Sequence, residues 1–190
     1  MSICWVICEH FVANKGVLSL PIMRDIGPLW GSLRTWRDHA TDNCVSNDFE
    51  QSSRALQRPM VGKCNLWFNE KHFVRLGRPD GIRTFPWNIT VEVEHSEDLV
   101  ALEIASNSKS YDIILPIGFD LISTEHMIPN TIEKHLRQNY LNHLTNIIET
   151  NAHIQYVFID SETKNIHPQL LGLDNFSIDT AESVIGLLGA

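Results

Sequence analysis

Two apolar stretches decide the fold of this chain: Asp112-Ile-Ile-Leu-Pro-Ile-Gly118 and Ile154-Gln-Tyr-Val-Phe-Ile-Asp160. Both are nearly continuous apolar runs, whereas a strand with one face in water alternates apolar and polar residues. Continuous runs are typical of strands covered on both faces, as in the centre of a parallel sheet. Pro116 removes one backbone donor from the first run, and it therefore indicates a bulge or an edge position there.

Further segments of the chain have strand or helix character. The six predicted strands are 3–8, 43–47, 64–69, 111–118, 154–159 and 176–178, and the predicted helices are 49–57, 99–106, 129–151 and 180–188. In the longest helix, apolar residues recur three and four positions apart, and Pro129 suits its first turn. The alternation of strands and helices favours an open α/β sheet with right-handed crossovers.

We therefore expect one Rossmann-like α/β domain over residues 1–190, with three layers and a mostly parallel sheet of five or six strands. Two stretches, about 13–40 and 71–94, carry several glycines, prolines and tryptophans and fit none of these elements. We expect them to be irregular insertions. Long connections of this kind often form lids or binding loops.

Composition excludes several classes of protein. The chain has 190 residues, of which 43% are hydrophobic and 20% charged, so it can form a sizeable core. The net charge of -8 argues against broad binding to nucleic acid or to an anionic membrane. No apolar run approaches the roughly 20 residues of a membrane span. The four cysteines lack CxxC spacing, and the first residues do not form a secretory leader, so we expect reduced thiols and a cytoplasmic protein.

Polar side chains follow the predicted strands where these end. In an open parallel sheet the carboxyl ends share one edge, and ligands bind outside it. We expect a site there, built from residues after the first, second, fourth and fifth predicted strands: Glu9, His10, Asp48, Gly118, Asp120 and Asp160. The alternative is that Asp and Asn follow strands because they form turns and cap helices.

Gly118-Phe-Asp120 is the most specific of these groups. A glycine directly after a buried strand lets a ligand approach the backbone, and the acid two residues later suits a ribose or sugar hydroxyl. Glu9 or His10 is the expected general base if a reaction occurs, since both follow the first strand. A turn or cap role for Asp120 remains the alternative.

A cluster of arginines and tryptophans occurs in Trp30-Gly-Ser-Leu-Arg-Thr-Trp36-Arg37. Arg34 and Arg37 suit bidentate contact with a phosphate or a carboxylate, and tryptophan offers a stacking face. The cluster therefore predicts an anion-binding segment. The alternative is a helix whose tryptophans lie in the core and whose arginines are solvated.

The common cofactor and metal motifs are missing from the sequence. There is no GxGxxG turn, no GxxxxGK[ST] loop and no GxSxG elbow. The nine histidines are scattered, without an HExxH or HxH pattern. We therefore predict no cofactor and no metal site, and we expect the histidines to lie at the surface or to cap helices.

Two segments resemble known families. Residues 112–121 resemble the strand-to-loop segment of sialyltransferase-like Rossmann proteins, which bind a cytidine-linked sugar at that edge. This resemblance implies the fold and the edge, and it assigns no catalytic residue. Residues 21–37 are similar to a segment of uncharacterised marine bacteriophage proteins, which implies no activity but favours a virion or host-modifying role.

These observations predict binding of a nucleotide or nucleotide-sugar-like anion at the carboxyl edge, with a glycosyltransferase-like reaction left open. The alternative is a non-enzymatic bacteriophage structural or protein-interaction module, in which Trp30 and Trp87 contact a partner. The expected partner is thus a small anionic ligand or a protein, with a homo-oligomer left open. A phage-encoded protein would act in the host cytoplasm or in the virion.

Overall fold

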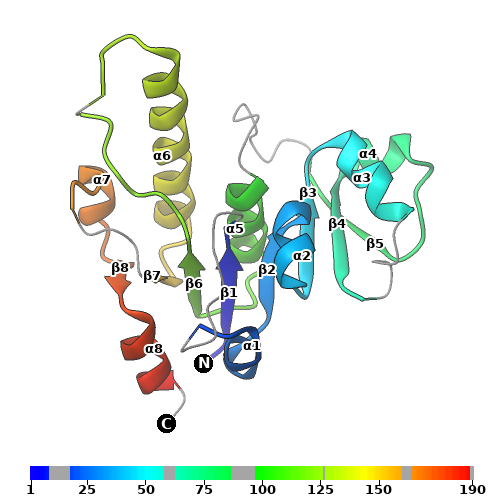
Figure 1. Ribbon diagram of the computed structural model, residues 1–190, viewed down its shortest axis with the longest axis horizontal. Coiled ribbons are helices and arrows are strands. Elements are labelled where there is room, and N and C mark those ends of the chain that lie inside the picture. The colour runs from blue at the N-terminus through cyan, green and yellow to red at the C-terminus, as the bar shows by residue number, and fades with distance from the viewer. Residues whose placement is uncertain (9–17, 58–62, 87–96, 126, 160–163, 189–190) are drawn as a thin grey trace.

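The computed structural model describes residues 1–8, 18–57, 63–86, 97–125, 127–159 and 164–188 (Figure 1). In this part of the chain eight strands form one sheet, in the order β5-β4-β3-β2-β1-β6-β7-β8. All neighbouring strands run parallel. The strands are β1 (Ile3–Ile7), β2 (Leu29–Ser32), β3 (Asn43–Ser46), β4 (Asn65–Asn69), β5 (Ile82–Phe85), β6 (Ile113–Ile117), β7 (Gln155–Ile159) and β8 (Phe176–Asp179).

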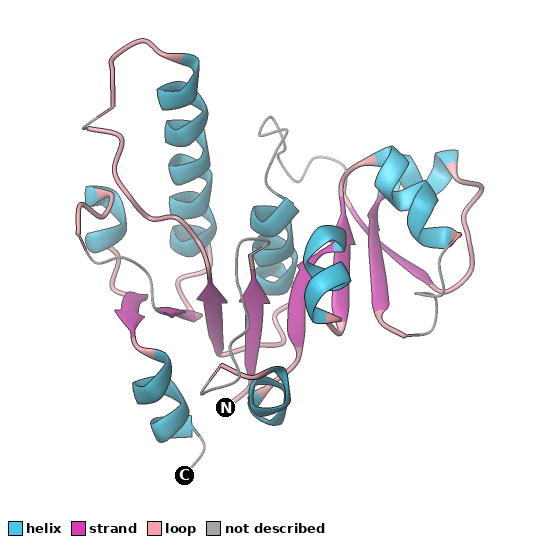
Figure 2. Cartoon of the chain, in the orientation of Figure 1, coloured by secondary structure: helices cyan, strands magenta, loops and turns pink. Residues whose placement is uncertain are grey.

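Helices connect and cover these strands (Figure 2). They are α1 (Leu20–Ile26), α2 (Leu33–His39), α3 (Phe49–Leu56), α4 (Glu70–Arg75), α5 (Glu97–Asn107), α6 (Ile132–Thr150), α7 (Pro168–Leu171) and α8 (Ala181–Leu188). Local sequence sets their starts: the Thr131 side chain accepts from the Lys134 amide at 3.2 Å at the start of α6, as an N-cap does. Among the described helices, none is both long and apolar enough to cross a membrane.

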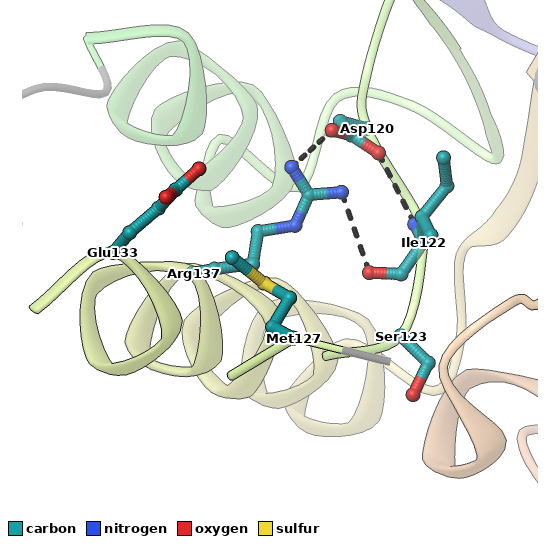
Figure 3. Close-up of a pocket in the computed structure, with 6 residues that line it drawn as sticks. All are labelled: Asp120, Ile122, Ser123, Met127, Glu133 and Arg137. Carbon is teal, nitrogen blue, oxygen red and sulfur yellow. Dashed lines mark hydrogen bonds and ion pairs between the residues drawn. The ribbon is translucent and has the colours of Figure 1, made fainter. Parts of the chain in front are cut away.

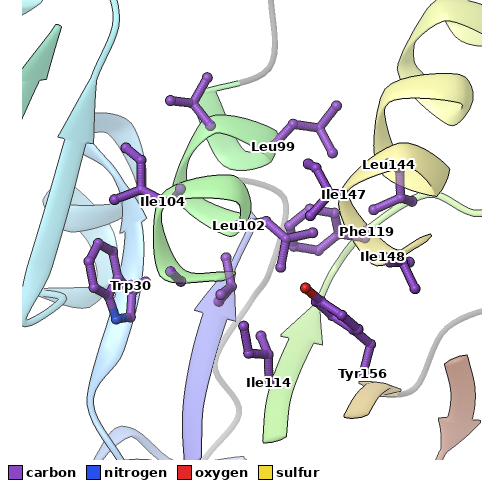
Figure 4. Close-up of a cluster of buried hydrophobic side chains, with 14 of the residues drawn as sticks. Trp30, Leu99, Leu102, Ile104, Ile114, Phe119, Leu144, Ile147, Ile148 and Tyr156 are labelled. Atoms are coloured by element: carbon purple, nitrogen blue, oxygen red, sulfur yellow. The ribbon is translucent and has the colours of Figure 1, made fainter. Parts of the chain in front are cut away.

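The sheet is the middle of three layers. Successive β1 residues point to opposite faces, with Cys4 and Val6 in the cluster under α5 and α6, and Trp5 and Ile7 in the cluster under α1 and α8. Figure 4 shows the first of these clusters, where side chains from α5 and α6 meet those of the central strands. Burial on both faces is the physical reason for the continuous apolar runs in the sequence.

Two buried aromatic side chains of the core donate hydrogen bonds that join strands to helices. Trp5 donates from Nε1 to the carbonyl of Met23 at 2.9 Å, which ties β1 to α1. Tyr156 of β7 donates from its hydroxyl to Ser106 Oγ of α5 at 2.8 Å. Because an unpaired buried polar group is costly, these bonds specify how α1 and α5 sit on the sheet.

The structure confirms all six predicted strands, with shifts of one or two residues at their ends. The prediction of five or six strands was wrong, because β2 and β5 bring the described total to eight. Both extra strands lie in the stretches 13–40 and 71–94, which were predicted to be irregular and which also contain α1, α2 and part of α4. β2 is a short strand with Gly31 inside it, and β5 lies at an edge of the sheet with two neighbouring exposed residues, so neither presents an apolar run.

Pro116 lies in a central strand and not at an edge of the sheet, so that part of the prediction was wrong. β6 pairs along its whole length with β1. On the other side, its register with β7 joins Ile113, Ile114 and Ile117 to partners but leaves out Leu115 and Pro116. The missing donor of proline is thus accommodated by a local interruption of one ladder.

The strand order places a topological switch point between β1 and β6. From β1 the chain continues to β2 on one side, and from β6 it continues to β7 on the other. The connections therefore diverge above the carboxyl ends of β1 and β6, where ligands bind in open α/β sheets. In Figure 1, α6 rises beyond these strand ends, and the connection from β6 runs up to its start.

Candidate ligand site at the carboxyl edge

Polar groups from several elements meet at the switch point. The Cys8 thiol, directly after β1, donates to Asp98 Oδ2 in the first turn of α5 at 3.1 Å. Tyr140 of α6 lies near both residues. Burial raises the pKa of the Tyr140 hydroxyl, and electrostatic interaction with Cys8 and Asp98 raises it further. The Arg137 guanidinium opposes that rise, and its central carbon lies 6.0 Å from the Tyr140 ring centroid. Cys8 at the end of β1 and residues of α5 and α6 thus form one polar group at this edge.

Next to this zone lies a hollow of about 260 Å³. One wall is the chain that follows β6, and the other is the start of α6 (Figure 3). It is lined by Asp120, Ile122, Ser123, Met127, Glu133 and Arg137. Two carboxylates, one guanidinium and one hydroxyl therefore surround a space of the size of a small polar ligand.

Arg137 is the central side chain of the hollow. Its Nη1 forms an ion pair with Asp120 Oδ2, and its Nη2 donates to the carbonyl of Ile122 at 3.3 Å. Its Nε is buried and has no hydrogen-bond partner. Asp120 Oδ1 in turn accepts from the Ile122 amide at 3.2 Å. The Arg137 side chain is 23% exposed and that of Asp120 is 48% exposed, so solvent and solutes reach both.

Gly118 begins the connection that carries Asp120. Its φ of 81° lies in the left-handed region, which glycine adopts without strain. The residue is exposed, whereas Phe119 turns back into the core against Phe158. The backbone of Gly118 is thus exposed at the carboxyl end of β6, and its contact with a ligand stays a prediction.

On the β3–β4 side of the same edge, the polar residues cap helices. Asp48 accepts from the Gln51 amide at 2.7 Å and so caps α3, and Asn69 accepts from the Lys71 amide at 2.9 Å and caps α4. Asn69 Nδ2 also donates to Asn47 Oδ1 at 2.8 Å. For Asp48 the structure therefore shows the cap role that was the alternative to ligand binding.

Glu97, at the start of α5, faces the end of β3. Its Oε1 accepts from the Asn47 amide at 3.1 Å and from Ser46 Oγ at 3.4 Å, while its buried Oε2 has no hydrogen-bond partner. Burial raises the pKa of Glu97 to about 7, although the Asn47 amide and the Arg34 charge oppose the rise. The carboxyl is thus close to half-protonated at neutral pH.

Arg34 and Asp120 lie at different parts of the carboxyl edge. Arg34 is exposed in the first turn of α2, after β2, and acts electrostatically on Glu97. Asp120 follows β6 and pairs with Arg137. β1 lies between β2 and β6, so Arg34 and Asp120 follow strands that are not neighbours, and Arg137 is the arginine that pairs with Asp120.

Other predicted site residues lie outside the described part of the structure. These are Glu9, His10 and Asp160, together with the side chain of Arg37, whose backbone is in α2. Within the described residues, no group of three or more His, Cys, Asp or Glu side chains is arranged to hold a metal ion.

Of the two tryptophans predicted to contact a partner, Trp30 is buried in the structure. Trp30 is 3% exposed, its ring centroid lies 5.5 Å from that of Trp67, and its Nε1 donates to the Tyr111 hydroxyl at 3.1 Å. Trp87 lies outside the described residues. The core position of Trp30, which was the alternative for the arginine–tryptophan cluster, is the correct one.

Sequence reasoning did not identify Arg137, Tyr140 or Asp98 as site residues. Arg137 is a polar member of a helix whose other face is apolar, Tyr140 belongs to the apolar pattern of that helix, and Asp98 fits the acidic first turn of α5. Only the packing of α5 and α6 above β1 and β6 brings them together. No local signal in the sequence marks them.

Comparison of the chain with protein-family models, with curated proteins and with solved structures finds no match. The resemblances of residues 112–121 to sialyltransferase-like proteins and of residues 21–37 to phage proteins therefore stay predictions.

Proposed function

We propose that the protein binds a nucleotide or nucleotide-sugar-like anion, and that the hollow beside β6 takes the sugar-phosphate part of it. The observation that carries this proposal is that Asp120 and Arg137 line one hollow at the switch point of a parallel sheet. Switch points are where open α/β sheets bind such ligands. A guanidinium beside a carboxylate offers one partner for a phosphate and one for a hydroxyl.

Each side chain has a role in this proposal. Arg137 contacts the phosphate, because its planar donors match phosphate oxygens in pairs. Asp120 accepts a hydrogen bond from a ribose or sugar hydroxyl, and Ser123 lines the same space. When the ligand binds, the Asp120–Arg137 ion pair either separates or stays in contact while Arg137 also donates to the phosphate. That costs little, because partly exposed ion pairs contribute only about 0–1 kcal/mol.

The size of the hollow limits the ligand. Pockets for drug-sized ligands usually measure about 300–1,000 Å³, and this hollow measures about 260 Å³. It therefore accommodates a sugar phosphate and leaves a nucleobase outside, above the carboxyl ends of the strands. A whole dinucleotide does not fit this space.

The proposal concerns binding, and a transfer reaction would need a general base as well. Glu9 and His10 are the proposed bases, since they follow Cys8 at the end of β1. A glycosyltransferase-like reaction would show as release of the nucleotide from a nucleotide sugar. Loss of that release in Glu9→Gln and His10→Gln variants that still bind the nucleotide would support these roles.

A thermal-shift screen tests the binding proposal. The panel holds nucleoside mono- and diphosphates, nucleotide sugars, sugar phosphates, inorganic phosphate, S-adenosylmethionine and divalent ions. A ligand at 100 times its Kd adds about 2.7 kcal/mol, which raises the Tm of a protein of this size by roughly 5–11 °C. We expect a selective shift with one nucleotide or nucleotide-sugar class, and a much smaller shift in Arg137→Met at the same ligand concentration.

A flat response across the panel would contradict the proposal and favour the interaction module. That alternative no longer includes Trp30, which is buried. In that alternative, the exposed apolar side chains at the start of α6 contact the partner. They are Ile128, which precedes α6 and is 75% exposed, and Ile132 and Leu136 in the first two turns of α6, which are 80% and 42% exposed. An Ile132→Glu variant that loses association in sedimentation velocity would then support the module.

A further inference from the structure

Two cysteines far from the ligand site lie against each other. Cys44 is in β3, and Cys64 directly precedes β4, the strand beside it. In the register of these strands Cys44 is opposite Leu66, so Cys64 is two residues before the partner and on the same face. The two side chains are hydrogen-bonded to each other and share one apolar cluster with Leu66 and Phe68.

The two thiols of this pair have different surroundings. Cys44 is fully buried, and its sulfur lies 3.1 Å from Thr41 Oγ1. Cys64 is partly exposed. The hydrogen bond from Cys44 lowers the pKa of Cys64, whereas burial raises the pKa of Cys44 well above its ordinary value. Cys64 is therefore the thiol that forms a thiolate and that a solute reaches first.

We propose that Cys44 and Cys64 are a redox-active pair that forms a reversible intramolecular disulfide. The two sulfurs are in hydrogen-bond contact, and because the two Cα atoms are diagonal neighbours in the strand register, the chain before β4 moves toward Cys44 when the bond forms. This inference is independent of the proposed ligand site, because the pair lies at the amino ends of β3 and β4, on the edge opposite Asp120 and Arg137.

The chemistry uses a hydroperoxide as the oxidant. The Cys64 thiolate attacks one peroxide oxygen, the O–O bond breaks, and the sulfur becomes a sulfenic acid while hydroxide takes up a proton to leave as water. The Cys44 sulfur then attacks the Cys64 sulfur, its proton goes to the departing hydroxyl, and a second water is released. In total, two thiols and one hydrogen peroxide give one disulfide and two waters.

The other two cysteines provide an internal comparison. Cys4 and Cys8 lie in the cluster under α5 and α6, on the opposite face of the sheet from Cys44. Burial raises the pKa of Cys4, and the Cys8 thiol donates to Asp98. We therefore expect these thiols to stay reduced under conditions that oxidise the Cys44–Cys64 pair.

Peptide mapping of the folded protein tests this proposal. The chain is treated with a small excess of hydrogen peroxide, quenched in acid, unfolded, alkylated and digested with trypsin. Cleavage after Arg54 and Lys63 separates Cys44 from Cys64, while Cys4 and Cys8 share the peptide that ends at Lys15. We expect a Cys44–Cys64 cross-linked peptide that is two hydrogens lighter than its parts, and an alkylated Cys4–Cys8 peptide.

Two further samples sharpen the result. Dithiothreitol should restore both alkylated peptides, and Cys64→Ser should leave Cys44 reduced at the same peroxide dose. The proposal is overturned if Cys44 and Cys64 both remain alkylated after peroxide treatment. It is also overturned if Cys64 proceeds to an acid that dithiothreitol does not reduce, or if it cross-links only between chains.

Discussion

The carboxyl edge of the sheet has two regions that look alike in sequence and differ in structure. At the β3–β4 side, the side chains of Asp48 and Asn69 accept hydrogen bonds from backbone amides of α3 and α4. At the β6 side, Asp120 forms an ion pair with Arg137, and the two side chains line a hollow. Both regions consist of a polar residue after a buried parallel strand, so the polar residue alone does not distinguish a cap from a site.

The two regions differ in the length of chain between the strand and the next helix. α3 begins directly after Asp48 and α4 directly after Asn69, so the side chain is within reach of unsatisfied amides of the first helical turn. After β6, the segment 118–131 separates the strand from α6. The carboxylate of Asp120 is then free to meet a side chain of a distant turn, and the connection leaves space between itself and the helix.

The largest predicted effect concerns Glu97, on the β3 side. The folded protein keeps the Glu97 proton up to about pH 7, whereas the unfolded chain loses it near the ordinary value of 4.5. The contribution of Glu97 to the free energy of unfolding is therefore largest below pH 4.5. It falls as pH rises from 4.5 to 7, by about 3 kcal/mol in total. Glu97→Gln should remove this loss and be more stable than the parent at pH 8.

Urea unfolding of both proteins at several pH values from 5 to 8 measures this effect. The difference between the two curves isolates Glu97, because all other titrating groups are common to both. Burial lowers the pKa of His72 and of His167, for example, in parent and variant alike. Parallel curves across this range would show that Glu97 ionises normally in the folded protein.

The second effect concerns ligand affinity on the β6 side. Arg137→Met should weaken binding of the nucleotide found in the screen by about 100-fold, because it removes charge-assisted hydrogen bonds to the phosphate. Asp120→Ala should likewise abolish detectable binding. Arg34→Met is the matched control, since Arg34 is an exposed arginine of the same edge. Calorimetric titration would show unchanged affinity in all three variants if the ligand bound elsewhere, and equal losses in the two arginine variants if it bound by charge alone.

The smallest effects are on stability, and they contrast Asp48 with Asp120. Asp48→Ala should cost about 1 kcal/mol, since it removes the N-cap of α3, and should leave ligand affinity unchanged. Asp120→Ala should change the Tm only slightly, because its ion pair is partly exposed. Thermal melts of both variants test the contrast. A large loss of stability in Asp120→Ala would make that residue a structural group.

Much of this fold could be predicted from residue patterns. The central strands β1, β6 and β7 are buried on both faces, so their apolar runs reveal them. β2 and β5 were not predicted, because neither has a clear apolar pattern. β2 is a short strand with an internal glycine, and β5 is an edge strand with two exposed residues. Their omission made two ordinary parts of the sheet look like insertions.

The site could be predicted only in part. Gly118 and Asp120 follow a recognisable strand, so their position at the carboxyl edge was accessible from the sequence. Arg137 was not, because its approach to Asp120 depends on how far α6 rises above the sheet and how the helix is rotated. The Cys44–Cys64 contact likewise depends on the register between β3 and β4, which the sequence does not state.

The most direct test of the central claim is a ¹H–¹⁵N NMR titration with the nucleotide or nucleotide sugar that stabilises the protein most. We predict that the largest shift changes occur at the amides of Gly118, Asp120, Ile122 and Ser123 and at the start of α6, and that they vanish in Arg137→Met. Saturating changes centred on Asp48 or Arg34, or a spectrum without any saturating change, would contradict the account.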